Sequence, residues 1–178
     1  KKKMGSFGIS RGAINAALDA GVDPRLEYNV LALGGSHLAE IFRDTDQKGL
    51  QKYKNKVMAL KGFTEQELYD YFYKTVRTDP KLVMRYIDAR KTLMFLGVFD
   101  STVPIKYGYR LRRGIGRPAT FFLPTGHYTS LLYTQFVKYV RTPQAMCVFP
   151  LDLVETESTA FYHRNFNNSG ARLKDIPY

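Results

Sequence analysis

The sequence is poor in the residues that build disulfides and metal centres. Its 178 residues include one cysteine, Cys147, and three histidines, His37, His127 and His163. A single cysteine cannot form an internal disulfide or a zinc–thiolate cluster, and the histidines lack the H-x-x-x-H spacing of a helical metal site. Cys147 lies in an apolar run, which is typical of a buried, unreactive thiol. The sequence therefore predicts neither a metal nor a cofactor.

Long apolar runs and acidic residues are also scarce. No stretch approaches the roughly 20 uninterrupted apolar residues of a membrane-spanning helix. A content of 44% hydrophobic and 24% charged residues is typical of a globular domain. The 27 Lys and Arg exceed the 16 Asp and Glu, but they fall in separate groups at 1–3, 52–56 and 110–113. We interpret them first as solvated faces and second as a surface for an anionic membrane or polymer. No nucleic-acid-binding signature is present, so we expect no nucleic-acid partner.

The most informative motif is a serine between two glycines, in the run Gly8-Ile9-Ser10-Arg11-Gly12. It follows a segment, 1–7, that can form a strand, and precedes an alanine-rich segment, 13–18, that can form a helix. In a strand-to-helix elbow the serine has a strained backbone, and the glycines let strand and helix approach without Cβ clashes. Ser10 is therefore the candidate nucleophile, although a tight turn without chemistry would give the same pattern.

A carboxylate and an imidazole follow two later predicted strands. The apolar run 92–99 leads to Asp100, and the run 119–123 leads to the loop that contains His127. The carboxyl ends of parallel strands are where such a sheet places functional groups. The chain order Ser10, Asp100, His127 is the order of the α/β-hydrolase triad.

On these three motifs the chain resembles the α/β-hydrolase superfamily, over about residues 1 to 140. The resemblance implies a fold of class α/β, namely the carboxyl-terminal half of an α/β-hydrolase, with a mostly parallel sheet flanked by helices. It also implies that Ser10 attacks a carbonyl, His127 transfers the proton and Asp100 orients the imidazole. The backbone N–H of Arg11 would then be one oxyanion donor.

The family's sheet has further strands before the elbow, and the second oxyanion donor comes from that half. We therefore expect the amino-terminal portion of the same hydrolase to be a missing segment or a separate polypeptide partner. The chain itself divides into core residues 1–36, a helical cap or lid at 37–91, core residues 92–140, and an extension at 141–178 that packs on the core.

The cap has clear helix signals. Thr64 and Glu67 form a capping box, and Asp79-Pro80 predicts a second helix with an apolar face through residues 82–90. An aromatic-lined cap would favour acyl or aryl esters of moderate size. Its candidate substrate-binding residues are Tyr69 and Phe72, together with Tyr128 beside the histidine.

Three further segments have a predicted structure. Residues 105–113 are predicted to form a short helix, and Thr129 is predicted to cap another one that contains Leu132, Phe136 and Val140. The asparagine-rich tail after residue 141 is interpreted as surface loop.

Alternative sites and functions remain open. Asp44 or Asp46 could supply the acid, and His37 or His163 is a weaker candidate for the imidazole. The predicted function is a serine hydrolase that forms an acyl-enzyme, acting on carboxylic esters or, as the nearer variant, on amide or peptide bonds. The alternative is a catalytically inactive, hydrolase-like binding module with a basic surface for an anionic polymer or membrane.

Overall fold

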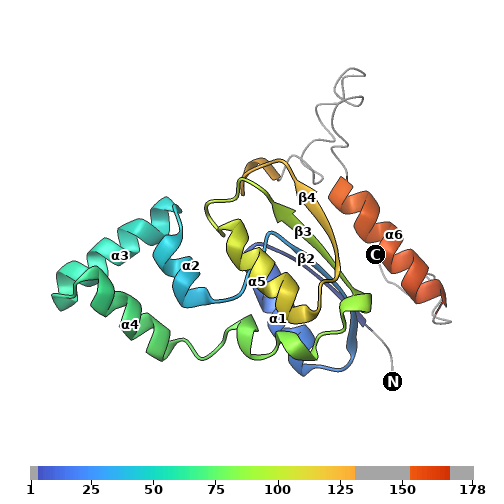
Figure 1. Cartoon of the computed structure of the whole chain (residues 1–178), viewed down its shortest axis with the longest axis horizontal. Coiled ribbons are helices and arrows are strands. Elements are labelled where there is room, and N and C mark those ends of the chain that lie inside the picture. Colours follow the sequence, from blue (N-terminus) through green and yellow to red (C-terminus); the bar gives the residue numbers. More distant parts are fainter. Residues whose placement is uncertain (1–3, 131–152, 169–178) are drawn as a thin grey trace, which may run out of the picture.

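The computed structural model of the chain describes residues 4–130 and 153–168. A parallel sheet has the strand order β1-β2-β3-β4, made of β1 (Met4–Ile9), β2 (Leu26–Ala32), β3 (Thr92–Gly97) and β4 (Ala119–Leu123) (Figure 1). The four predicted strands are confirmed. The third strand is shorter than predicted, since it ends at Gly97 and leaves Val98 and Phe99 exposed.

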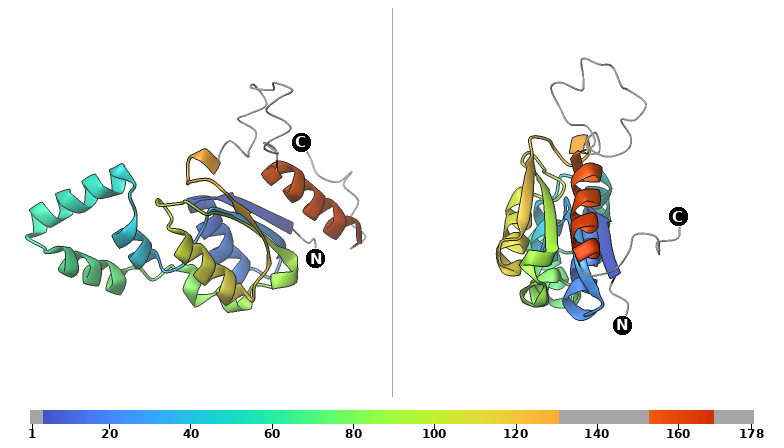
Figure 2. Two further views of the ribbon diagram at one scale, coloured as in Figure 1. Left: turned by 45° about the horizontal axis from the view of Figure 1, so that its top comes forward. Right: turned by 90° about the vertical axis from the view of Figure 1, so that its right-hand side faces the viewer.

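Helices cover both faces of this sheet. The helices α1 (Arg11–Val22) and α5 (Ile105–Ile115) pack on one face, where Leu31 and Met94 point. Helix α6 (Leu153–Asn168) packs on the opposite face, as Figures 1 and 2 show from different sides. Side chains of consecutive strand residues thus pack on opposite faces of the sheet, as the two-residue repeat of a strand requires.

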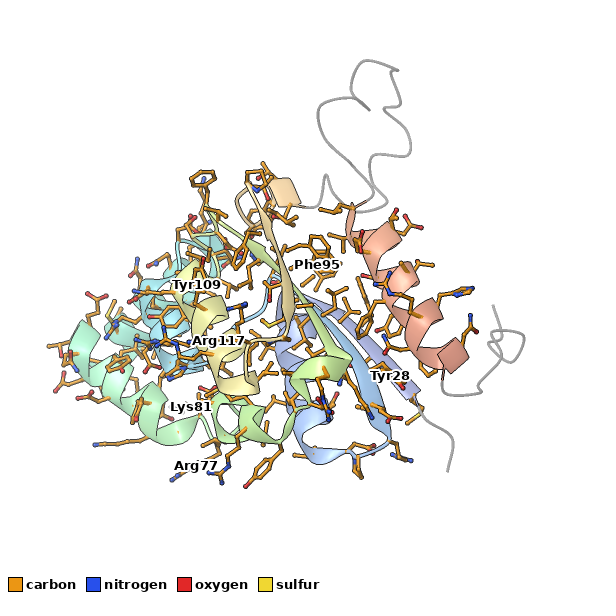
Figure 3. All side chains as sticks on the ribbon, turned by 45° about the vertical axis from the view of Figure 1, so that its right-hand side comes forward. Tyr28, Arg77, Lys81, Phe95, Tyr109 and Arg117 are labelled. Carbon is orange, nitrogen blue, oxygen red and sulfur yellow. The ribbon has the colours of Figure 1, made fainter. Side chains whose placement is uncertain are left out.

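The two layers are filled by side chains of different size. Three buried alanines of α1, Ala13, Ala16 and Ala17, bring that helix close to the sheet. On the other face, Tyr28 and Phe95 fill the space in front of α6 (Figure 3), and Tyr28 makes an edge contact with Phe161 of that helix.

Helix α6 corrects the prediction of a loop at Asn165 and Asn167. Its apolar side chains, among them Val154 and Phe161, are buried against the sheet, and this packing outweighs the low helix propensity of asparagine. The Asn165 amide donates to the carbonyl of Phe161, one turn back, at 2.8 Å. The predicted helix through Leu132, Phe136 and Val140 lies outside the described residues, as does Cys147.

The chain leaves the core after β2 and forms three helices, α2 (Leu38–Asp44), α3 (Lys48–Lys61) and α4 (Glu65–Thr75). These helices, which we call the cap, extend away from one side of the sheet (Figures 1 and 2). The predicted capping box is present: the Glu67 N–H donates to the Thr64 hydroxyl, and the Thr64 N–H donates to the Glu67 carboxylate.

The return from the cap differs from its prediction. Asp79 does cap a turn at Pro80, but three short 3-10 turns follow in place of an α-helix, at η1 (Pro80–Leu82), η2 (Met84–Tyr86) and η3 (Ala89–Lys91). Val83 packs against Gly21 of α1, while the next residue, Met84, packs against Gly114 of α5. Contact with two helices by consecutive side chains favours the irregular backbone over one continuous helix.

In residues 4–130 and 153–168, no helix combines the length and the apolar character that crossing a bilayer requires.

Candidate active site

Ser10 lies between the last residue of β1 and the first residue of α1. Its backbone has φ 57° and ψ −120°, a conformation that L-residues rarely adopt. Two backbone hydrogen bonds keep the residue in this strained conformation. The Ser10 N–H donates to the carbonyl of Ala32 at 2.8 Å, and the Ser10 carbonyl accepts from the Ala13 N–H at 3.0 Å. The serine is therefore fixed at the carboxyl end of the sheet.

The two glycines of the motif have unequal roles. A Cβ on Gly8 would lie 2.2 Å from the carbonyl oxygen of Gly12, so any side chain there would push strand and helix apart. A Cβ on Gly12 would meet no atom within 4 Å in the described part of the chain. The steric prediction is correct for Gly8 and wrong for Gly12.

His127 lies in the loop after β4, and its Nε2 is 2.8 Å from the Ser10 hydroxyl oxygen. The loop is held by its own hydrogen bonds: the Thr129 hydroxyl accepts from the Gly126 N–H at 2.9 Å, and the Ser130 hydroxyl donates to the Gly126 carbonyl at 2.8 Å. The imidazole is buried, so its orientation is fixed by packing as well.

Asp100 follows β3, and its Oδ2 is 2.6 Å from Nδ1 of His127. The other carboxylate oxygen accepts two backbone N–H groups, from Thr102 at 3.0 Å and from Val103 at 2.8 Å. With Nδ1 donating to the Asp100 carboxylate, Nε2 is left to accept from the Ser10 hydroxyl. The structure thus joins the three predicted side chains in one hydrogen-bonded chain.

Arg11 is the first residue of α1. The first N–H groups of a helix have no partner within the helix, and the positive end of the helix dipole lies there. Arg11 thus lies at the helix end where such donors are found, and its role as an oxyanion donor stays a prediction.

Neither alternative carboxylate bonds to an imidazole in the described chain. Asp44 accepts from Arg43, from Lys106 at 2.5 Å and from Tyr107 at 2.6 Å, and these bonds, that of Arg43 above all, hold its pKa well below the usual range. Asp46 accepts from the hydroxyls of Ser101 and Thr102, beside Asp100.

The other two histidines lie elsewhere. His37 precedes α2 in a left-handed conformation, and its Nδ1 is 2.9 Å from the hydroxyl of Ser36. Burial lowers the pKa of His37 below 6.5. His163 lies on the exposed side of α6, where its ring contacts the amide of Asn167 at 2.7 Å.

The predicted substrate-binding aromatics separate into two groups. Tyr128 is 62% exposed, and its ring meets that of His127 edge-on with 5.5 Å between the centroids. Phe72 instead stacks on Phe42 of α2 at 4.2 Å, and Tyr69 lies against the guanidinium of Arg43. The structure brings Tyr128 to the candidate site, while the contacts described for the two cap aromatics lie within the cap.

Sequence reasoning missed one aromatic residue at the site. Phe99 is 70% exposed and precedes Asp100. It is joined to the histidine loop by its N–H, which donates to the Thr125 carbonyl at 3.0 Å. The signal in the sequence is a large apolar residue directly after a buried apolar run and directly before Asp100.

In the described ranges, no group of three His, Cys, Asp or Glu side chains could hold a metal ion.

Comparisons with known proteins find similarity at the level of the fold. No protein-family model and no curated protein sequence matches the chain. An esterase of Pyrococcus furiosus superposes with a TM-score of 0.58 at 14% identity, over 91% of this chain and 54% of that one. Acetyl xylan esterase 1 from a Thermoanaerobacterium species superposes with 0.59 at 21% identity, over 71% and 40%. The acylaminoacyl peptidase of Pyrococcus horikoshii gives 0.58 at 11% identity, over 92% and 24%.

The chain spans about half the length of the first of these proteins and less of the other two. Its parallel sheet, its flanking helices and its neighbours agree with the fold that the three sequence motifs predicted. The chain has the α/β-hydrolase fold, in the portion that runs from the elbow strand onward.

Proposed function

We propose that this chain carries the reactive centre of a serine hydrolase, with Ser10 as nucleophile, His127 as general base and acid, and Asp100 as the group that orients the imidazole. The observation that supports it most strongly is the unbroken chain of bonds from the Ser10 oxygen, 2.8 Å to His127, and from His127, 2.6 Å to Asp100. Three elements far apart in the sequence supply these groups, so local structure alone does not explain the arrangement.

The proposed reaction begins with attack of the Ser10 oxygen on the carbonyl carbon of the substrate. Nε2 of His127 takes the hydroxyl proton, and the negative charge that forms on the carbonyl oxygen is stabilised by the N–H of Arg11. Collapse of the tetrahedral intermediate breaks the bond to the leaving group, which receives the proton from His127. Water then attacks the acyl-serine by the same steps and releases the acid.

Asp100 supports this reaction through its position and its charge. It fixes the tautomer in which Nδ1 carries the proton, and it stabilises the imidazolium that forms when Nε2 is protonated. Its two backbone donors hold the carboxylate in place and oppose its rotation away from the imidazole.

Carboxylic esters are the proposed substrates, with amide or peptide bonds as the nearer variant. Two of the similar structures are called esterases and the third an acylaminoacyl peptidase. Tyr128 and Phe99 offer exposed aromatic surface beside His127 and Asp100 for an acyl or aryl group. We propose that Tyr69 and Phe72 contribute to substrate binding as part of the cap.

The proposal is tested with a fluorophosphonate probe, which reacts only with an activated serine. We expect the natively produced protein to be labelled at Ser10, Ser10→Ala to be unlabelled, and Ser6→Ala to be labelled like the wild type. Ser6 is a matched control because it lies on the same strand but bonds to Asn29 at 2.7 Å. A folded wild type that is not labelled at Ser10 would contradict the proposed function.

The proposed cap selectivity has its own test, a series of p-nitrophenyl esters from acetyl to palmitoyl. We expect a preference for acyl chains of moderate size. Equal rates across the series would remove the cap as a selector and leave the proposed chemistry in place.

A further inference from the structure

The cap and the candidate reactive centre meet at one short segment. The chain emerges from α2 at Asp44, Thr45 and Asp46, and this segment lies against residues 100–103, which we call the acid turn because it carries Asp100. The two segments are more than 50 residues apart in the sequence. Their contact is therefore a tertiary feature and is not imposed by chain connectivity.

Thr45 and Asp46 make four hydrogen bonds with the acid turn. The buried Thr45 hydroxyl donates to the carbonyl of Thr102 at 2.7 Å, and the Asp46 N–H donates to the carbonyl of Ser101 at 3.2 Å. The Asp46 carboxylate accepts from the hydroxyls of Ser101 at 2.5 Å and Thr102 at 3.0 Å. Both the backbone and the side chains of the turn are held.

The two peptide groups whose carbonyls are held in this way, those of Ser101 and Thr102, also carry the N–H groups that bond to Asp100. The N–H groups of Thr102 and Val103 donate to one oxygen of Asp100, and the other oxygen receives Nδ1 of His127. A rotation of the turn would redirect both N–H groups and with them the carboxylate. A shift of about 1 Å in such a group is enough to slow a reaction substantially.

Asp44, the neighbour of this pair, has different partners. Its carboxylate accepts from Lys106 and Tyr107 of α5 and from Arg43, and it makes no bond to the acid turn in the described chain. Asp44 therefore attaches the cap to a core helix, whereas Thr45 and Asp46 attach it to the turn that carries Asp100. The two carboxylates form a natural pair of test and control.

We propose that Thr45 and Asp46 are positioning residues for Asp100, and that they align the reactive centre by holding the acid turn. This inference rests on the proposed function. Neither residue touches the substrate; both act through Ser101 and Thr102. The bonds of Asp46 to these hydroxyls hold its own pKa below the usual range, so its carboxylate is ionised at neutral pH and accepts both donors.

Steady-state hydrolysis of p-nitrophenyl acetate by the natively produced protein tests the inference. We expect Asp46→Asn to lower kcat roughly tenfold with KM within about twofold, because alignment for the chemical step is lost and substrate binding is not. Thr45→Val, which removes the buried donor and keeps the shape, should act in the same direction. Asp44→Asn is the matched control and should keep kcat within about twofold of wild type.

Ser101→Ala serves if a variant at Thr45 or Asp46 fails to fold. Ser101 is exposed, and its loss removes only one donor to Asp46, so we expect a smaller fall in kcat, about threefold, again at unchanged KM. In the double variant with Asp46→Asn, kcat should fall by less than the product of the two single effects, since both substitutions disturb the same bond between Ser101 and Asp46.

Two results would overturn the inference. One is an active wild type in which Asp46→Asn, Thr45→Val and Ser101→Ala all keep the kcat of the wild type. The other is an equal fall of kcat in Asp44→Asn, which would indicate general loosening of the cap. A wild type without labelling at Ser10 would instead be a failure of the proposed function and is recognised separately by the fluorophosphonate experiment.

Discussion

The described part of the molecule contains two serine–histidine hydrogen bonds of nearly the same length, in very different surroundings. Ser10 lies 2.8 Å from Nε2 of His127, and Ser36 lies 2.9 Å from Nδ1 of His37. Ser10 is partly exposed on a strained elbow, while Ser36 is 0% exposed. The second nitrogen of His127 meets a buried carboxylate, and in the described chain none bonds to the second nitrogen of His37.

The difference teaches that a serine–histidine contact is not by itself a reactive pair. A nucleophile needs access to its substrate, and its base needs a third group that fixes the tautomer and stabilises the imidazolium. Burial near the start of α2 works against a charged His37, which is the reverse of what a general base requires. The pair at Ser36 and His37 is therefore expected to serve the local structure.

The largest expected contrast is between alanine variants of the two serines. Ser10→Ala should lower kcat by about 10⁴-fold or more, because the acylated atom is removed, whereas Ser36→Ala should retain kcat within about threefold. Ester hydrolysis measured on both variants, with circular dichroism to establish that each is folded, makes the comparison. An inactive but folded Ser36→Ala would contradict the assignment of a structural role to Ser36 and His37.

Removal of the Asp100 carboxylate should leave His127, like His37 in the described chain, without a carboxylate bonded to its second nitrogen. Asp100→Asn replaces an acceptor for Nδ1–H by an amide that can donate, so the wrong tautomer is favoured and kcat should fall by about 10³- to 10⁴-fold. The Michaelis constant should change little. Activity of Asp100→Asn within a few-fold of wild type would assign the orienting role to another group.

The elbow itself can be tested at its two glycines. Gly8→Ala would force a Cβ into the carbonyl of Gly12 and should cost about 2 kcal/mol or more of the free energy of unfolding. Gly12→Ala enters open space near the start of α1 and should be neutral or stabilising by up to about 1 kcal/mol. Urea denaturation of both variants gives the two values, and equal losses would contradict the asymmetry.

The smallest expected effect concerns pH. The native pKa of His37 lies below its unfolded value of 6.5, so the unfolded chain binds more protons as the pH falls through 6.5 and below. This residue thus contributes stability that is present above pH 6.5 and is lost on acidification. His37→Asn, which suits the left-handed backbone there, should lose less stability than wild type between about pH 8 and about pH 5. Parallel stability curves for the two proteins would show that His37 makes no such contribution.

The sequence predicted the sheet, the elbow and the order of the three candidate groups because each has a local cause. A buried strand is an apolar run, and the sharp turn at Ser10 requires a glycine at position 8, where a Cβ would meet the carbonyl of Gly12. The conformation of residues 80–91 could not be predicted, since it depends on Val83 and Met84 reaching two different helices. The contact of Asp46 with the acid turn could not be predicted either, because its donors, Ser101 and Thr102, are more than 50 residues away in the sequence.

Helix α6 is a second case in which tertiary packing outweighs the local sequence pattern. Asparagines favour loops locally, yet α6 forms because Val154 and Phe161 are buried against β2 and β3, which no local pattern around Asn165 reveals. Local patterns thus predicted the candidate groups of the site, and tertiary contacts determine what surrounds them.

The order of the strands has a consequence for synthesis of the chain. The sheet is laid down from β1 to β4 in the order of translation, and the imidazole arrives only with the loop after β4. A nascent chain that has completed its elbow therefore presents a serine with no base beside it. Until the loop after β4 docks, the hydrogen-bonded chain from Ser10 through His127 to Asp100 is incomplete, and under the proposed function such an intermediate should be inert toward esters.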